Sequence, residues 1–98
     1  MRIVISPLGL GDLRQIVRYI AADNPRAARR LVQDLERFCT EAILANPEIG
    51  KPADEIMPGL RIATKRNYRI CYRVSNKTIE IARVIHGARL LDDLFSVD

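Results

Sequence analysis

The chain has 98 residues, of which 48% are apolar and 29% charged, a balance that indicates a globular domain and excludes a disordered chain. No apolar run approaches the roughly 20 residues that a membrane-spanning helix needs. The first residues also lack the long apolar stretch and cleavage site of a signal peptide. We therefore expect one cytoplasmic domain over residues 1–98.

Positive charge is concentrated in the C-terminal part of the chain. Residues 60–89 contain eight basic residues and one acid, Glu80, so this segment carries +7 and the rest of the chain −3. Such a concentration predicts an acidic partner, which could be a nucleic acid, a nucleoprotein machine or an acidic protein. The alternative is a solvated basic surface. The basic residues are Arg61, Lys65, Arg66, Arg69, Arg73, Lys77, Arg83 and Arg89.

The N-terminal part predicts a strand and a helix. Residues 2–5 are short and β-branched, which is typical of a strand. Ser6-Pro7 then indicates a helix start, because the serine hydroxyl can cap free N–H groups and proline suits the first helical position. The apolar residues that follow recur at helical spacing, namely Leu13, Ile16, Val17 and Ile20.

A second helix is predicted between Asn24-Pro25 and Asn46-Pro47. The residue before a proline is disfavoured in the α region, so Asn24 or Asp23 can cap the helix that follows. Because only a short break separates the two helices, they should fold back on each other as a hairpin. The expected apolar stripe of the second helix is Ala27, Leu31, Leu35, Phe38 and Ala42.

The C-terminal part predicts a loop followed by three antiparallel strands. Residues 47–59 hold three of the five prolines and two of the five glycines, which favours a loop. From residue 60 the apolar period becomes two. Tyr68 and Tyr72 should therefore share one face, most simply the core, and Arg69 and Arg73 the other. Ile79, Ile81, Arg83 and Ile85 continue this alternation in the last strand.

Gly87 breaks the last strand, and residues 90–95 suggest a short tail helix or a segment that docks on a partner. The predicted fold is thus α+β, in the order β-α-α-β-β-β-(α). In this small single domain the helical hairpin packs on one face of a mainly antiparallel sheet, so that both helical stripes share one core.

The sequence offers little to a metal, a cofactor or a catalytic triad. It lacks a glycine-rich phosphate loop and any metal-spaced cluster of Cys and His, so we expect neither metal nor cofactor. Cys39 and Cys71 are expected to be small apolar core residues. His86 is the only histidine, and nothing in the sequence positions a serine and a carboxylate around it for a triad. An arginine-centred ribonuclease remains open, since guanidinium groups bind phosphate bidentately.

Three segments in succession resemble toxins of the RelE/ParE superfamily, specifically the ParE branch, also called plasmid stabilisation proteins. They are YIAADNPRAARRL at 19–31, YRICYRV at 68–74 and RVIHGAR at 83–89. The resemblance implies a growth-arresting toxin of a type II toxin–antitoxin system, which poisons DNA gyrase and so blocks replication. It also implies neutralisation by a ParD-type antitoxin in a hetero-oligomer that reaches operator DNA only through the antitoxin.

The related RelE branch, which cuts mRNA in the ribosome, is the alternative. It resembles this chain at Arg69 and Arg89, where it has phosphate-binding arginines. Its tail tyrosine corresponds to Phe95, which has no proton to donate. Its two lysines correspond to Leu60 and Ile62, although a one-residue shift would bring in Arg61. Missing acid and base groups cost orders of magnitude in rate, which favours gyrase inhibition without catalysis.

A third interpretation is a non-toxic family member that binds its antitoxin and acts in operon autoregulation. Under the favoured interpretation, the basic strand face and the tail contact the target and the antitoxin, and His86 is a contact or structural residue and not a catalytic base. The predicted contact residues are Arg61, Arg69, Arg73, Arg83, His86, Arg89, Leu90, Leu94 and Phe95.

Overall fold

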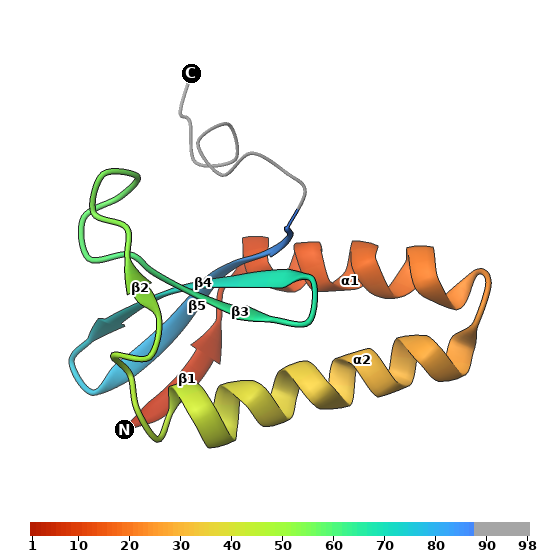
Figure 1. The fold of residues 1–98 in the computed structure, drawn as a ribbon, viewed down its shortest axis with the longest axis horizontal. Coiled ribbons are helices and arrows are strands. Elements are labelled where there is room, and N and C mark those ends of the chain that lie inside the picture. Colours follow the sequence, from red (N-terminus) through yellow and green to blue (C-terminus); the bar gives the residue numbers. More distant parts are fainter. Residues whose placement is uncertain (88–98) are drawn as a thin grey trace.

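The computed structural model describes residues 1–87, which form a five-stranded sheet with two helices packed on one face (Figure 1). In chain order the elements are β1 (Arg2–Ile5), α1 (Pro7–Ala21), α2 (Pro25–Arg37), the π-helical turn η1 (Phe38–Ile43), β2 (Lys51–Pro52), β3 (Arg61–Lys65), β4 (Tyr68–Ser75) and β5 (Thr78–His86).

The strands lie in the order β1-β5-β4-β3-β2. β1 runs parallel to β5, and the other neighbours are antiparallel. The predicted α+β fold is therefore confirmed, with a strand more than expected. The predicted tail helix lies outside the described residues. Within them, no helix is long and apolar enough to cross a membrane.

Both helices begin where the sequence predicts, because each has a side-chain cap followed by a proline. The Ser6 hydroxyl accepts a hydrogen bond from the backbone N–H of Gly9 at 3.0 Å. The side-chain oxygen of Asn24 accepts one from the N–H of Ala27 at 3.1 Å. Each cap satisfies an N–H group that has no partner inside the helix.

The second helix differs from the prediction at its C-terminal end. α2 gives way to η1, where the N–H of Leu44 donates to the carbonyl of Cys39, five residues back, at 2.9 Å. Because a π-helical turn holds more residues than an α-helical turn, the phase of the side chains changes. Ile43 is fully buried instead of the predicted Ala42, and regular helix ends there, before Asn46.

The three C-terminal strands form the predicted meander, and tight turns connect them. Asn76 and Lys77 join β4 to β5 with φ angles of 50° and 61°, the positive values that a type I′ turn requires. Arg66 begins the turn between β3 and β4 with a φ of 57°. Neither turn has glycine at these positions.

The segment predicted as a loop also contains a short strand. Lys51 and Pro52 pair with β3 at the sheet edge, where proline blunts further strand pairing. The buried Tyr72 holds residues 47–50, just before this strand, in place. Its hydroxyl donates to the carbonyl of Pro47 at 2.7 Å and accepts from the N–H of Gly50 at 2.8 Å. Burial raises the pKa of Tyr72, which keeps this hydroxyl a donor.

The last strand departs from strict alternation. β5 has one residue, Ala82, that has no partner in β4, which is a β-bulge. Consequently Ile81 and Val84 both face the helices, while Ile85 packs on the opposite side of the sheet. The alternation predicted through Arg83 was therefore wrong beyond Ile81.

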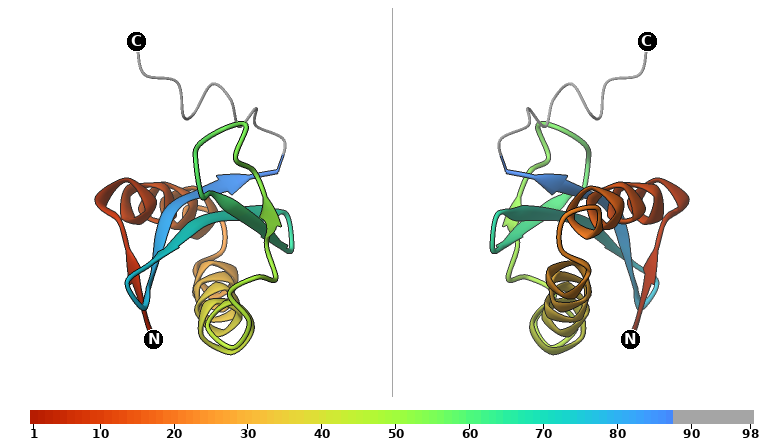
Figure 2. Two further views of the ribbon diagram at one scale, coloured as in Figure 1. Left: turned by 90° about the vertical axis from the view of Figure 1, so that its left-hand side faces the viewer. Right: turned by 90° about the vertical axis from the view of Figure 1, so that its right-hand side faces the viewer.

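The core has two parts, one on each face of the sheet. The larger lies under the helices and contains Leu31, Leu35, Ile43, Ala63, Ile70, Tyr72, Ile79, Ile81 and Val84. The smaller contains Ala53, Leu60, Cys71 and Ile85. In Figure 2 the loop after β2 lies on the opposite side of the central strands from α2. This loop thus covers part of the face that the helices leave uncovered, around Cys71 and Ile85.

The turn at Lys77 offers a test of this description. Replacing Lys77 by glycine should raise the free energy of unfolding by about 0.5–1 kcal/mol, because the left-handed conformation strains an L-residue and not glycine. Lys77→Ala removes the same charge but keeps the strain, and is the control. Urea unfolding of both variants would measure the difference, and equal stabilities would contradict it.

Candidate functional site

Two of the predicted contact arginines share the face of the sheet that lies opposite the helices. Arg69 and Arg73 alternate in β4 with Tyr68 and Tyr72, which pack in the core under the helices. Arg69 is half-buried, whereas Arg73 is exposed and its guanidinium lies 3.5 Å from the carboxylate of Glu80. The predicted placement of the tyrosines in the core and of the two arginines on the other face is confirmed.

Arg61 lies on the opposite face from these two arginines. It pairs with Tyr72 across the sheet, and its guanidinium donates to the carbonyl oxygens of Gly50 at 2.7 Å and Glu48 at 3.3 Å. Arg61 therefore stabilises the loop before β2. The structure does not bring it together with Arg69, as a single basic face would require.

Arg83 forms a partly buried ion pair with Asp12 of α1. Its Nε and Nη2 donate to the two carboxylate oxygens at 2.7 and 2.8 Å, and the N–H of Val84 donates to the same carboxylate at 3.0 Å. Only 14% of the Arg83 side chain and 11% of the Asp12 side chain are exposed. This hydrogen bonding raises the pKa of Arg83. Arg83 thus joins α1 to β5.

The start of α1 contacts β5 at the bulge, next to that ion pair. Ser6 donates its N–H to the carbonyl of Ile81 at 2.9 Å and its hydroxyl to the carbonyl of Ala82 at 2.8 Å. A Cβ atom on Gly9 would lie only 3.0 Å from the Ile81 carbonyl oxygen, so glycine permits this close approach. Asp12 was not among the residues predicted from the sequence. Its position one helical turn before the apolar Ile16, on the same side of α1, is the signal that could have indicated its contact with the sheet.

His86 ends β5 as an exposed residue in edge-to-face contact with Tyr68, with ring centroids 5.5 Å apart. The N–H of Gly87 donates to the carbonyl of Asn67 at 2.7 Å, which fixes where the last strand leaves the sheet. The remaining predicted contact residues, Arg89, Leu90, Leu94 and Phe95, lie outside the described residues.

The positions that correspond to catalytic lysines of the ribonuclease branch are occupied by core residues. Leu60 is fully buried in the smaller cluster, and Ile62 packs against it. Burial raises the pKa of both Cys39 and Cys71 to about 11, so neither thiol is activated as a nucleophile. Among the described residues, no group of three Cys, His, Asp or Glu side chains could hold a metal ion.

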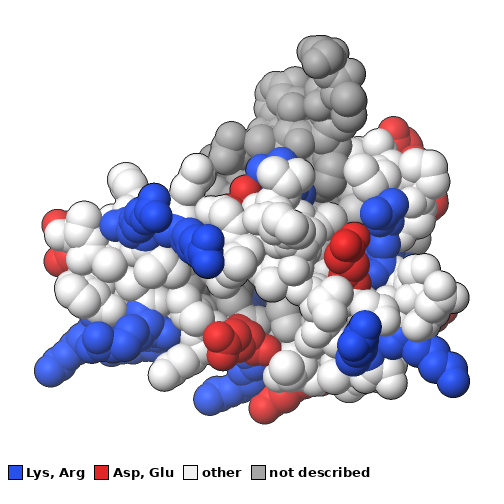
Figure 3. Space-filling model, turned by 180° about the vertical axis from the view of Figure 1, so that it is seen from behind, with Lys and Arg blue, Asp and Glu red and all other residues white. Residues whose placement is uncertain are grey.

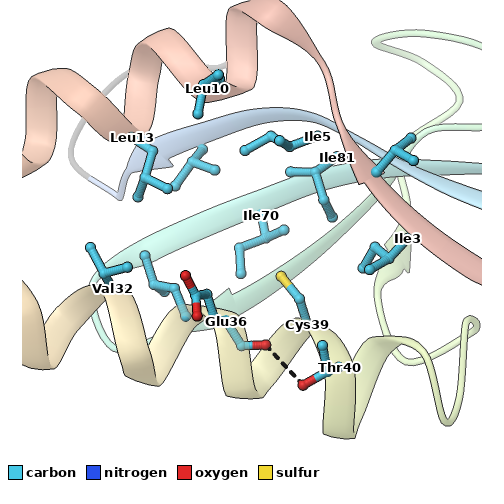
Figure 4. Close-up of a pocket in the computed structure, with 13 residues that line it drawn as sticks. Ile3, Ile5, Leu10, Leu13, Val32, Glu36, Cys39, Thr40, Ile70 and Ile81 are labelled. Carbon is cyan, nitrogen blue, oxygen red and sulfur yellow. Dashed lines mark hydrogen bonds between the residues drawn. The ribbon is translucent and has the colours of Figure 1, made fainter.

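The structure also reveals an apolar groove that the sequence did not predict. It runs between α1 and α2 above β1 and has a volume of about 410 Å³ beside that strand (Figure 4). Leu13 of α1 and Val32 of α2 form its walls, and Ile3, Ile70 and Ile81 of the sheet form its floor. We call it the interhelical groove.

Charged residues border this groove, whose lining is almost entirely apolar. Arg14 and Arg18 of α1 and Arg29 of α2 lie beside its continuation along the hairpin. Figure 3 looks onto this face, where uncharged groups cover much of the centre and most of the basic groups lie toward the margins. Such a groove suits an apolar helix face with acidic flanks.

A helical hairpin packed on a mainly antiparallel sheet that carries a basic strand is the architecture of RelE/ParE superfamily toxins. A family model described as "ParE toxin of type II toxin-antitoxin system, parDE" matches residues 3–91. The chain therefore belongs to this family and is a ParE-type toxin of a type II toxin–antitoxin system.

Curated and solved relatives agree with this assignment. Toxin ParE1 of Mycobacterium tuberculosis, from strains CDC 1551 and H37Rv, is 37% identical over 60 residues, which is 60% of each chain. A solved chain of the chromosomal ParDE system from P. aeruginosa is 26% identical, with a TM-score of 0.69 over 88% of this chain and 95% of that one.

A second solved structure supports the fold alone. The toxin–antitoxin complex RelBE2 from Mycobacterium tuberculosis contains a chain that is 24% identical, with a TM-score of 0.64 over 87% of this chain and 95% of that one. This likeness concerns the fold, so the choice between the two expected activities has to come from individual residues.

The ion pair between Asp12 and Arg83 should stabilise the fold far more than an exposed pair. Asp12→Ala should lower the free energy of unfolding by about 3 kcal/mol, because Arg83 would lose its carboxylate and the N–H of Val84 its acceptor. Asp34→Ala removes an exposed pair with Arg66 and should cost less than about 0.5 kcal/mol. Denaturant unfolding that gave equal losses would contradict the assignment.

Proposed function

We propose that this toxin arrests growth by inhibiting DNA gyrase, and thereby replication, and that a ParD-type antitoxin neutralises it. The observation that carries the choice of target is the packing of Leu60 and Ile62 in the core. These are the positions where the ribonuclease branch would need proton-transferring lysines. Without such groups, general acid–base catalysis of RNA cleavage loses its main contribution to rate.

Arg61 does not replace those lysines. Its guanidinium is engaged by the carbonyl oxygens of Gly50 and Glu48, on the face of the sheet that carries Tyr72. Arg69 alone among the described residues keeps a position of the phosphate-binding arginines. This set favours a surface that binds a target over one that cleaves RNA.

The target surface in this proposal is the face of β4 that carries Arg69 and Arg73, continued by the C-terminal residues. Positive charge there would speed the encounter with gyrase or with its DNA, and apolar side chains of the tail would add buried contact area. Arg83 contributes indirectly, because its ion pair with Asp12 fixes the end of β5 from which the tail departs.

The antitoxin surface in this proposal is the interhelical groove. Its apolar walls and the basic residues beside it suit an amphipathic acidic segment of the antitoxin. β1 lies at the groove and has β5 as its neighbour on one side in the described sheet, so its other edge can accept an added strand. The match to a ParDE system supports an antitoxin of the ParD type.

The test combines purified toxin, supercoiled plasmid, gyrase and ATP, and measures linear DNA after protease treatment. The toxin should produce linear DNA only when gyrase is present. The double variant Arg69→Ala, Arg73→Ala should be at least about tenfold less potent, because it removes two contact charges. Arg26→Ala, Arg30→Ala removes two exposed charges from α2 and should keep full potency.

Each other outcome identifies an alternative. Undiminished potency of the Arg69, Arg73 variant would contradict the proposed target surface. No effect on gyrase, together with cleavage at codon positions in a translating extract, would instead favour the ribonuclease. No effect in either assay, and no growth arrest on expression, would favour a non-toxic member that binds its antitoxin and acts in autoregulation.

A further inference from the structure

The interhelical groove contains one charged side chain at an unexpected place. Of the thirteen residues that line the groove beside β1, Glu36 is the only one that carries a charge. It lies one helical turn after Val32 on α2, and Figure 4 shows its carboxylate directed into the groove, between Val32 and Ile70 in that view. Most of the surrounding side chains are aliphatic.

Nothing in the described part of the chain pairs with this carboxylate. It forms neither a hydrogen bond nor an ion pair with any residue in 1–87, and the nearby Thr40 hydroxyl donates to the backbone carbonyl oxygens of Glu36 and Arg37 instead. Its charge nevertheless acts within the groove. The pKa of Cys39, which also lines the groove, is raised first by burial of the thiol and second by the negative charge of Glu36.

Solvent stabilises this carboxylate while the groove is open, since Glu36 is exposed. A segment that fills the groove would remove that solvent. Burying an unpaired carboxylate costs several kcal/mol, so an occupant with only apolar side chains at this place would bind poorly. The groove lining offers no basic side chain. Arg29 lines the adjoining hollow together with Glu36 but forms no ion pair with it, so we expect the occupant to bring the partner.

We propose that Glu36 is a specificity-determining residue of the interhelical groove, which selects an antitoxin segment that carries a lysine or arginine in the middle of its apolar face. The proposal rests on the proposed function, in which the antitoxin occupies this groove. Acidic flanks of the segment would meet Arg14, Arg18 and Arg29 beside the groove. A central cation among apolar residues and acidic flanks would thus separate cognate from non-cognate antitoxins, because an antitoxin without the cation would leave Glu36 buried and unpaired.

The experiment measures the affinity between the purified toxin and the ParD-type antitoxin that forms a complex with it, by titration calorimetry. Glu36→Gln should weaken binding at least about 30-fold, because removing one member of a buried charged pair leaves the other charge without its partner. Glu41→Gln removes the same charge from an exposed position on η1 that does not line the groove, and should leave the affinity unchanged.

A third variant separates this proposal from the one on which it rests. Val32→Gln places a polar side chain in the groove wall without adding charge, and should weaken binding if the antitoxin occupies the groove. Weakening by Val32→Gln with unchanged or tighter binding of Glu36→Gln would overturn the role of Glu36 and keep the groove. Unchanged affinity of Val32→Gln would overturn the groove as the antitoxin surface.

The antitoxin supplies the final arm. Each lysine or arginine of the antitoxin's toxin-binding segment is replaced by glutamine in turn and titrated against wild-type toxin and against Glu36→Gln. One replacement should weaken binding to the wild type and have little further effect on Glu36→Gln, which is the signature of a direct pair. Additive losses at every position would overturn the pairing. Melting temperatures confirm that each variant is folded.

Discussion

The carboxylate of Asp12 holds the structure together at the point where β5 extends beyond β1. β1 pairs with residues 78–81 of β5, so the backbone beyond the bulge at Ala82 lacks a neighbouring strand on that side. The first two turns of α1 take the place of that strand. The hydroxyl of Ser6, the N-cap of α1, donates to the carbonyl of Ala82. The carboxylate of Asp12 accepts hydrogen bonds from the N–H of Val84 and from the guanidinium of Arg83.

This contact involves elements of both candidate surfaces. It joins α1 to β5, and α1 forms one wall of the interhelical groove (Figures 1 and 4). It also fixes the end of β5, beside the face that carries Arg69. Arg83, which was predicted to lie on a binding face, therefore stabilises the contact between α1 and β5. Arg61 likewise supports a loop.

The two surfaces suit the proposed function, in which the toxin acts alone and an antitoxin neutralises it in a complex. The groove is apolar and flanked by basic groups, as expected for coupled folding and binding of an acidic amphipathic segment. The strand face of Arg69 and Arg73 carries more basic groups than the groove lining, which under the proposed function suits rapid encounter with a nucleoprotein target. Because the two surfaces lie on different faces of the sheet, an antitoxin segment confined to the groove would leave the face of Arg69 and Arg73 uncovered.

Local chemistry made much of the fold predictable. Ser6 and Asn24 cap helices through contacts within three residues, and the alternation around Tyr72 depends on a period that the sequence displays directly. The bulge at Ala82 was not predictable, since it depends on contacts with α1 more than 70 residues away. η1 likewise shifted the buried position from Ala42 to Ile43.

The candidate site was predictable only in part, for the same reason. The shared face of Arg69 and Arg73 followed from strand geometry. The groove arises from two helices that meet in space, and in the sequence Glu36 resembles any exposed acid on an amphipathic helix. Whether a charged side chain is buried, and which group it pairs with, depends on tertiary structure. From their charge alone, Arg61 and Arg83 were predicted to lie on the binding face, but both bind groups within the fold.

The most direct test of two separate surfaces is a crystal structure of this toxin bound to its antitoxin. The account predicts antitoxin density in the interhelical groove, against Leu13 and Val32, with the edge of β1 available for strand pairing. A complex in which the groove is empty and the antitoxin contacts only the face of Arg69 and Arg73 would contradict it. In that case the antitoxin would compete directly with the target for one surface.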